Sequence, residues 1–115
     1  MSLKMRTREL NGVMVIDLGG QITLGEASAA LRDEVRDQVS HGSNKILLNL
    51  ADVTYIDSAG LGELTAAYTS VKNRGGALKL LNLTKRVHDL MQITKLYTVF
   101  DAYDDEKKAL ASFVS

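Results

Sequence analysis

The stretch that most constrains this fold is a hydrophobic run, Ile46–Leu50, followed by the segment Asp57–Gly62. The run is typical of a buried β-strand, residues 51–56 are expected to form a short connection, and a helical pattern begins at Ser58 and continues to about Arg74. The first N–H groups of a helix lack intrahelical partners, and the dipole is positive there. We therefore expect a hydroxyl presented at a helix start. The two glycines of the segment are expected to let another molecule approach the backbone.

A β-hairpin is predicted at the N-terminal end of the chain. Met5–Leu10 and Val13–Leu18 have strand patterns, and Asn11-Gly12 between them supplies the two positive φ angles of a type I′ turn. The second strand is apolar on both faces at its start, as expected of an interior strand. Gly19-Gly20 is expected to break or bend it.

Helical and strand patterns alternate through the rest of the chain. A helix is predicted from Gly25 to about His41, with Thr23 and Glu26 at capping-box spacing before it. Further strands are predicted at 45–50 and 77–81 and near 101–103, and further helices from Ser58, Thr84 and Asp104, the last two residues acting as caps. The third helix is expected to bury Val87, Leu90 and Met91, with Ile93 as a further candidate, and the fourth Leu110, Phe113 and Val114. The order β-β-α-β-α-β-α-β-α favours an α/β fold with a mixed, mostly parallel sheet.

Composition excludes several classes of function. The 115 residues fit one domain, 1–115, and the 14 basic and 14 acidic side chains cancel, so nucleic acid and anionic membranes are not expected partners. The absence of cysteine excludes disulfides, thiolate catalysis and cysteine metal sites. The N-terminus lacks the apolar stretch of a signal peptide, and the apolar runs are too short to span a membrane. A cytoplasmic location without membrane insertion is therefore expected.

A hydrolytic role for Ser58 is not predicted. The nucleophile-elbow motif requires glycine two residues earlier, where this chain has Ile56. A triad also needs a histidine base, and His41 and His88 are expected at a helix end and within a helix. A serine at a helix start is most often an N-cap, a task that Asp57 could share or take.

Nucleotide and metal sites have weak support. Gly60-Leu61-Gly62 begins like a dinucleotide fingerprint, but Thr65 occupies the third glycine position and the chain has no phosphate loop. A weak nucleotide-binding module stays an alternative, because an exposed helix start can hold a phosphate. Acidic residues gather near the last helix at Asp101, Asp104, Asp105 and Glu106. Their spacing matches no common calcium loop, so we expect capping, with neither a metal nor a cofactor.

The sequence resembles the STAS-domain family, and specifically the small stand-alone anti-sigma factor antagonists of bacteria. The resemblance runs from the hairpin and Gly20–Thr23, through Asp52–Gly62, to Gly75–Leu80. Its most specific part is the Ile-Asp-Ser-x-Gly-Leu-Gly element after a hydrophobic strand. The resemblance implies the STAS fold, a mixed sheet of four to five strands with about four helices packed mainly on one side.

The resemblance also implies a binding protein regulated by phosphorylation, not an enzyme. In this family the serine at the position of Ser58 is phosphorylated by an anti-sigma factor that is a serine kinase of the ATPase fold. The unphosphorylated antagonist binds that kinase and releases a sigma factor, and a PP2C-type phosphatase restores the active form. The residues expected to bind the partner are Thr23, Asp57, Ser58, Ala59, Gly60, Leu61 and Gly62.

One position departs from the family pattern. Many relatives have Gly-x-Leu-Asp where this chain has Gly20-Gln21-Ile22-Thr23, so Thr23 replaces an acidic residue. The loss of this negative charge is expected to alter either kinase docking or the way in which the phosphorylated state is destabilised. Thr23 is also a candidate second phosphorylation site, as in stressosome-type relatives. A STAS scaffold or accessory subunit of a stressosome or lipid-transport ATPase is the alternative function. The oligomeric state is left open between a monomer and a weak homodimer, because an edge strand can pair.

Overall fold

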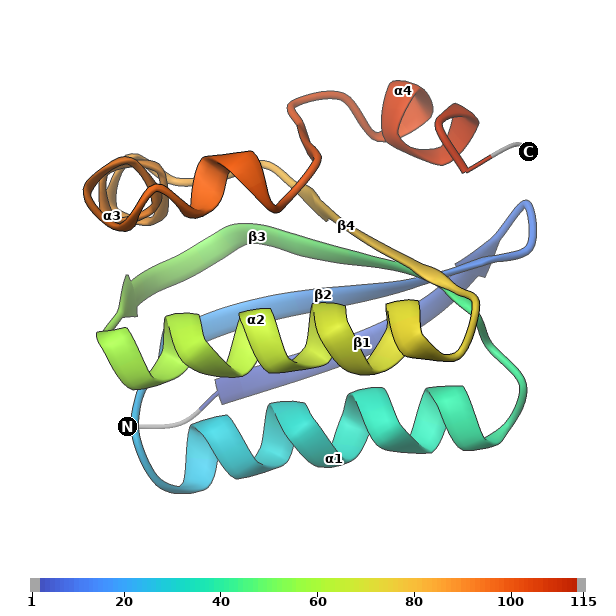
Figure 1. Cartoon of the computed structure of the whole chain (residues 1–115), viewed down its shortest axis with the longest axis horizontal. Helices are drawn as coiled ribbons and strands as arrows, with labels where there is room; N and C mark the ends of the chain where they lie inside the picture. The colour runs from blue at the N-terminus through green and yellow to red at the C-terminus, as the bar shows by residue number, and fades with distance from the viewer. Residues whose placement is uncertain (1–2, 114–115) are drawn as a thin grey trace.

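The computed structural model describes residues 3–113, and its elements follow the predicted order (Figure 1). They are β1 (Leu3–Leu10), β2 (Val13–Ile22), α1 (Glu26–Ser40), β3 (Lys45–Ile56), α2 (Ser58–Asn73), β4 (Ala77–Leu81), α3 (Lys85–Thr94), the 3-10 helix η1 (Leu96–Thr98), β5 (Ala102–Tyr103) and α4 (Glu106–Ala111). None of the helices in this range is long and apolar enough to cross a membrane.

The sheet has five strands in the order β1-β2-β3-β4-β5. β1 and β2 are antiparallel, and the other neighbouring pairs are parallel. The turn between β1 and β2 has positive φ at Asn11 (53°) and at Gly12 (79°), as the hairpin prediction requires. The predicted mixed, mostly parallel sheet is therefore confirmed.

β2 and β3 are both longer than predicted. β2 continues through Gly19 and Gly20 to Ile22, and the expected connection at residues 51–56 is the second half of β3. These two extensions pair with each other, ending with Ile22 beside Ile56, and the pairing contains two register shifts. At both shifts the extra residue lies in β3, so β3 is the bulged strand. β2 continues through its two glycines without a break, and the prediction of a connection at residues 51–56 is wrong.

The helices lie mainly on one side of the sheet. α1 and α2 run side by side against one face, and Figure 1 shows α4 on the opposite side. Successive residues of a strand point to opposite faces of the sheet. Ile16 and Leu48 belong to the main core on one face. Val15 and Leu47 belong to a smaller cluster with Phe113 on the other face. The main core comprises residues from β2, β3, β4, α1, α2 and α3. The predicted arrangement is confirmed, with α4 as the helix on the second face.

Helix boundaries follow some predicted caps and not others. Thr84 caps α3, and its side chain accepts a hydrogen bond from the backbone N–H of Val87. The N-cap of α1 is Gly25, with φ of 103°, and this helix has no side-chain cap. Thr23 instead contributes its carbonyl oxygen, which accepts bonds from the backbone N and the hydroxyl of Ser28 at 3.2 and 2.8 Å. The predicted capping box is therefore wrong.

The last two helices also correct the sequence analysis. Asp105, not Asp104, caps α4 and accepts from two backbone N–H groups of its first turn. Ile93 is 79% exposed, whereas Val87 and Met91 are buried in the core as expected. Val114 lies outside the described residues, so its predicted core contact is not placed.

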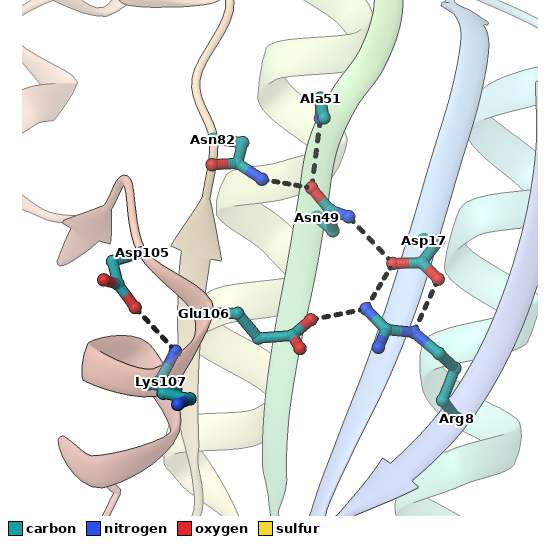
Figure 2. Close-up of polar contacts among 8 residues, drawn as sticks. All are labelled: Arg8, Asp17, Asn49, Ala51, Asn82, Asp105, Glu106 and Lys107. Atoms are coloured by element: carbon teal, nitrogen blue, oxygen red, sulfur yellow. Dashed lines mark hydrogen bonds and ion pairs between the residues drawn. The ribbon is translucent and has the colours of Figure 1, made fainter.

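A polar network crosses the sheet on the face opposite α1 and α2 (Figure 2). Arg8 of β1 donates two bonds to the carboxylate of Asp17, at 2.7 and 2.9 Å, and one to Glu106 of α4, at 2.6 Å. Asn49 also donates to Asp17, at 2.9 Å. Burial alone would raise the pKa of Asp17, but the bonds from Arg8 and Asn49 outweigh it and the pKa is lowered. The network ties α4 to the first three strands.

The same network supports the irregular part of β3. The side-chain oxygen of Asn49 accepts bonds from the backbone N of Ala51, at 3.1 Å, and from the amide of Asn82, at 3.2 Å (Figure 2). Ala51 lies at the first register shift between β2 and β3. A side chain thus accepts a hydrogen bond from a backbone N–H at the point where the regular pairing is interrupted.

Candidate functional site

The start of α2 places an exposed hydroxyl at the end of β3. Asp57 has an extended backbone and is the N-cap of the helix, and its Oδ1 accepts a bond from Gly60 N at 2.7 Å. Ser58 is the first helical residue and is exposed to solvent. The capping role considered for Ser58 therefore belongs to Asp57. This leaves the serine hydroxyl available at the positive end of the helix dipole.

Asp57 also fastens the connection between β2 and α1 to this helix start. Its Oδ2 accepts a bond from Leu24 N at 3.1 Å, and its own backbone N donates to Ile22 O at 3.3 Å. The hydrogen bonds from Gly60 N and Leu24 N lower the pKa of Asp57, because they stabilise the charged carboxylate. Asp57 is therefore an ionised bridge between two segments of the chain.

The glycines of the segment have different roles. A Cβ at Gly60 would lie 2.0 Å from Ile22 O and 2.9 Å from Ile56 Cγ1, and the residue is buried. Its lack of a side chain thus serves packing between α2 and β2, which corrects the expectation that it admits another molecule. Gly62 is exposed, and no described atom comes within 4 Å of a Cβ built there. Leu61 is 2% exposed and belongs to the core.

The remaining predicted site residues lie at the same end of the sheet as Ser58. Because β2 and β3 are parallel and Ile22 pairs with Ile56, the residues that follow both strands emerge together. Figure 1 shows the β2–α1 connection and the start of α2 at one end of the molecule, with α3 at that end too. Thr23 and Ala59 are both half-buried there. The structure therefore brings the predicted segments together but leaves Gly60 and Leu61 beneath the surface.

Several large apolar side chains near this end are exposed, and the sequence analysis missed them. Leu24 is 79% exposed and Tyr55 is 36% exposed, with the Arg86 guanidinium 4.1 Å from the centre of the Tyr55 ring. Leu24 lies three residues before the buried Ala27, so helical spacing alone would place it on the apolar stripe of α1. The helix starts only at Glu26, and for that reason Leu24 projects from the preceding connection. The sequence offers no signal for this exposure.

Neither histidine has a hydrogen bond to Ser58 among the contacts of the described residues. His41 is the C-cap of α1, at the helix end away from Ser58, and its Nδ1 lies 2.7 Å from the carbonyl oxygen of Asp37. His88 is in α3, and its Nδ1 lies 3.6 Å from a carboxylate oxygen of Asp89. Across residues 3–113, no three His, Cys, Asp or Glu side chains are grouped so that they could hold a metal ion. The arrangement can present a hydroxyl for recognition or modification.

Comparisons with known proteins agree with this architecture. The chain is 31% identical over 101 residues to the anti-sigma-B factor antagonist of Bacillus subtilis, an alignment that covers 88% of this chain and 91% of the relative. A crystal structure of an anti-sigma factor antagonist from Mycobacterium paratuberculosis matches 96% of this chain and 93% of its own, with a TM-score of 0.82 and 20% identity.

The Bacillus cell fate determinant SpoIIAA has the same fold in two states. Its unphosphorylated form matches with a TM-score of 0.71 and 18% identity, covering 95% of this chain and 96% of that chain. Its phosphorylated form matches with a TM-score of 0.70 and 19% identity, covering 91% and 96%. The STAS domain family model matches residues 4–109. With nearly the whole chain matched, this protein belongs to the STAS domain family.

Proposed function

We propose that this chain is an anti-sigma factor antagonist that phosphorylation of Ser58 switches off. In its unphosphorylated form it binds an anti-sigma factor serine kinase and so releases a sigma factor. The observation that carries the proposal is the exposed Ser58 hydroxyl, which Asp57 leaves free by taking the capping role. The name of the Bacillus subtilis relative, an anti-sigma-B factor antagonist, supports the same function.

The switch follows from charge at the helix start. A phosphate on Ser58 adds about −1.5 to −2 charges at neutral pH. It lies next to the ionised Asp57, so a partner surface shaped for a neutral hydroxyl meets repulsion and a desolvation cost. Within the protein, the positive end of the α2 dipole offsets part of that charge. We therefore expect phosphorylation to change partner affinity much more than it changes the fold.

The two states of SpoIIAA support this expectation. The unphosphorylated and phosphorylated forms of that relative match the present fold almost equally, with TM-scores of 0.71 and 0.70. A STAS fold is thus compatible with both states. In the proposed cycle the chain acts as a binding protein and not as an enzyme, and a PP2C-type phosphatase removes the phosphate. The proposed partner-facing residues are Thr23, Ser58, Ala59 and Gly62, with Asp57, Gly60 and Leu61 shaping the surface from within.

Phosphorylation with purified components tests the proposal. The chain is incubated with ATP and an anti-sigma factor serine kinase, starting with the anti-sigma-B factor of Bacillus subtilis and extending to kinases from the host of this chain. Intact-mass measurement is expected to show a gain of one phosphate on the wild type and none on Ser58→Ala. If the wild type gains no phosphate from any of these kinases, a non-phosphorylated STAS scaffold becomes the better account.

A binding measurement tests the switch itself. Ser58→Asp places a carboxylate at the first helical position and is expected to abolish kinase binding in calorimetry. Its thermal midpoint should stay close to that of the wild type, because an acidic side chain is favourable at a helix start. Equal binding by the wild type and Ser58→Asp would overturn the switch.

A further inference from the structure

Leu24 is exposed and at the same time held in place. Its relative exposure is 79%, so its side chain contributes little to the core. Its backbone N is fixed by a 3.1 Å hydrogen bond to Asp57 Oδ2, in the residue that immediately precedes Ser58. The backbone from which this apolar side chain projects is thereby kept in a defined position relative to the start of α2.

Asp57 uses both of its carboxylate oxygens inside the protein. Oδ1 accepts from Gly60 N and Oδ2 accepts from Leu24 N. The close approach of Gly60 to Ile22 O adds a third connection between the start of α2 and the end of β2. Leu24 and Ser58 therefore belong to one preorganised surface, although 33 residues of chain separate Leu24 from Asp57.

We propose that Leu24 is the apolar anchor through which the partner recognises the Ser58 surface, and that Asp57 is a positioning residue for it. This inference rests on the proposed function, because the occupant is the anti-sigma factor serine kinase. That partner is expected to have an apolar recess beside the atoms that meet the Ser58 hydroxyl. Burying an apolar side chain whose backbone is already fixed gives a favourable contact without the further cost of ordering that segment of the chain.

Ile93 provides a matched control on the same molecule. It is also 79% exposed and similar in size, but it lies on α3, and no hydrogen bond among residues 3–113 joins it to Asp57. Truncation of either side chain removes a comparable apolar area from the free protein. A general effect of surface hydrophobicity would therefore affect both variants, whereas an anchor at Leu24 would affect one.

The test measures kinase binding by calorimetry and Ser58 phosphorylation kinetics, with the kinase that modifies the wild type. Leu24→Ala is expected to weaken binding by about tenfold to a hundredfold, and Ile93→Ala by less than about threefold. In the phosphorylation assay Leu24→Ala should raise KM and leave kcat nearly unchanged, since Leu24 contributes to docking and does not touch the transferred phosphate. Thermal melts of both variants should match the wild type.

A double-mutant cycle tests whether Asp57 positions Leu24. Asp57→Asn retains one oxygen acceptor for Gly60 N but replaces the other acceptor by an amide donor facing Leu24 N, so the connection is released. This variant is expected to weaken binding, and adding Leu24→Ala to it should weaken binding by only a few fold more. If Leu24→Ala and Asp57→Asn weaken binding independently of each other, Asp57 does not act by positioning Leu24.

The outcomes separate the anchor from the function. If Ser58→Asp abolishes binding while Leu24→Ala binds within about twofold of the wild type, the anchor is overturned and the proposed function stands. Equal losses for Leu24→Ala and Ile93→Ala also overturn it. A wild type that neither binds nor is phosphorylated by any kinase in the set overturns both proposals.

Discussion

Replacement of Gly60 by alanine tests the closest packing contact at the site. The added Cβ would lie 2.0 Å from the carbonyl oxygen of Ile22 and 2.8 Å from its carbonyl carbon. Both are backbone atoms, so no side-chain rotation can relieve the overlap. Either the start of α2 or the end of β2 must move by about 1 Å, since real contacts of this kind are not shorter than 3.0 Å.

The size of the effect follows from three contributions. Overpacking a tight site costs roughly 1–3 kcal/mol. The shift also disrupts the bond from Asp57 N to Ile22 O, worth about 1 kcal/mol, while alanine gains about 1 kcal/mol over glycine in a helix. The last two nearly cancel, so Gly60→Ala is expected to lower the free energy of unfolding by about 1–3 kcal/mol. For a chain of this size that lowers the melting temperature by roughly 4–12 °C.

Gly62→Ala is the matched control, two positions along the same helix. Space is open around Gly62 in the described structure, so only the gain in helix propensity applies. This variant should be about 0.5–1 kcal/mol more stable than the wild type. Urea unfolding and calorimetric melts measure both variants. Equal stability of the two alanine variants would refute the packing of α2 against Ile22.

Three further predictions concern polar groups. Asp57→Ala should reduce the free energy of unfolding by about 1–2 kcal/mol in urea titrations, because it removes both the helix cap and the bond to Leu24. The folded state lowers the pKa of Asp17, so the stability that this group contributes is present above about pH 4 and is lost as the pH falls through its folded pKa. Asp17→Asn should therefore show a smaller drop in urea midpoint between pH 6 and pH 3 than the wild type. Arg32 and Glu63 form an ion pair of 2.8 Å between α1 and α2, and the Glu63 side chain is only 8% exposed. Arg32→Ala should therefore lower the urea midpoint more than Glu63→Gln does, because only the first substitution leaves this carboxylate without its partner.

Local patterns predicted the order of the elements well, because they depend on neighbours in the sequence. Asn11-Gly12 forms the predicted turn, Thr84 caps the predicted helix, and the apolar spacing of α2 is observed. The limits of β2 and β3 were wrong because the extra length is stabilised by pairing between the two strands. The glycines in β2 and the polar residues after Leu50 gave a turn-like local signal that this pairing overrides.

Choices between adjacent residues were less predictable. Thr23 and Asp104 are good caps by composition, but Gly25 and Asp105 hold the positions where α1 and α4 begin. A cap needs the right backbone geometry as well as the right side chain, and that geometry depends on where the preceding strand leaves the sheet. Ile93 fits the helical spacing of α3 but is exposed, because the side of a short helix that meets the core depends on its docking.

By itself, the sequence determined the alternation of strands and helices and the presence of a serine where a buried strand meets a helix. Only the tertiary structure decided that Asp57, not Ser58, caps that helix and that Leu24 lies on the surface. It also decided that position 60 has no room for a side chain, because Ile22 O packs against it. The physical reason is that each of these outcomes depends on how β2 and α1 meet the start of α2. Parallel pairing of β2 with β3 brings those segments together across 33 residues of chain, a proximity that local spacing does not encode.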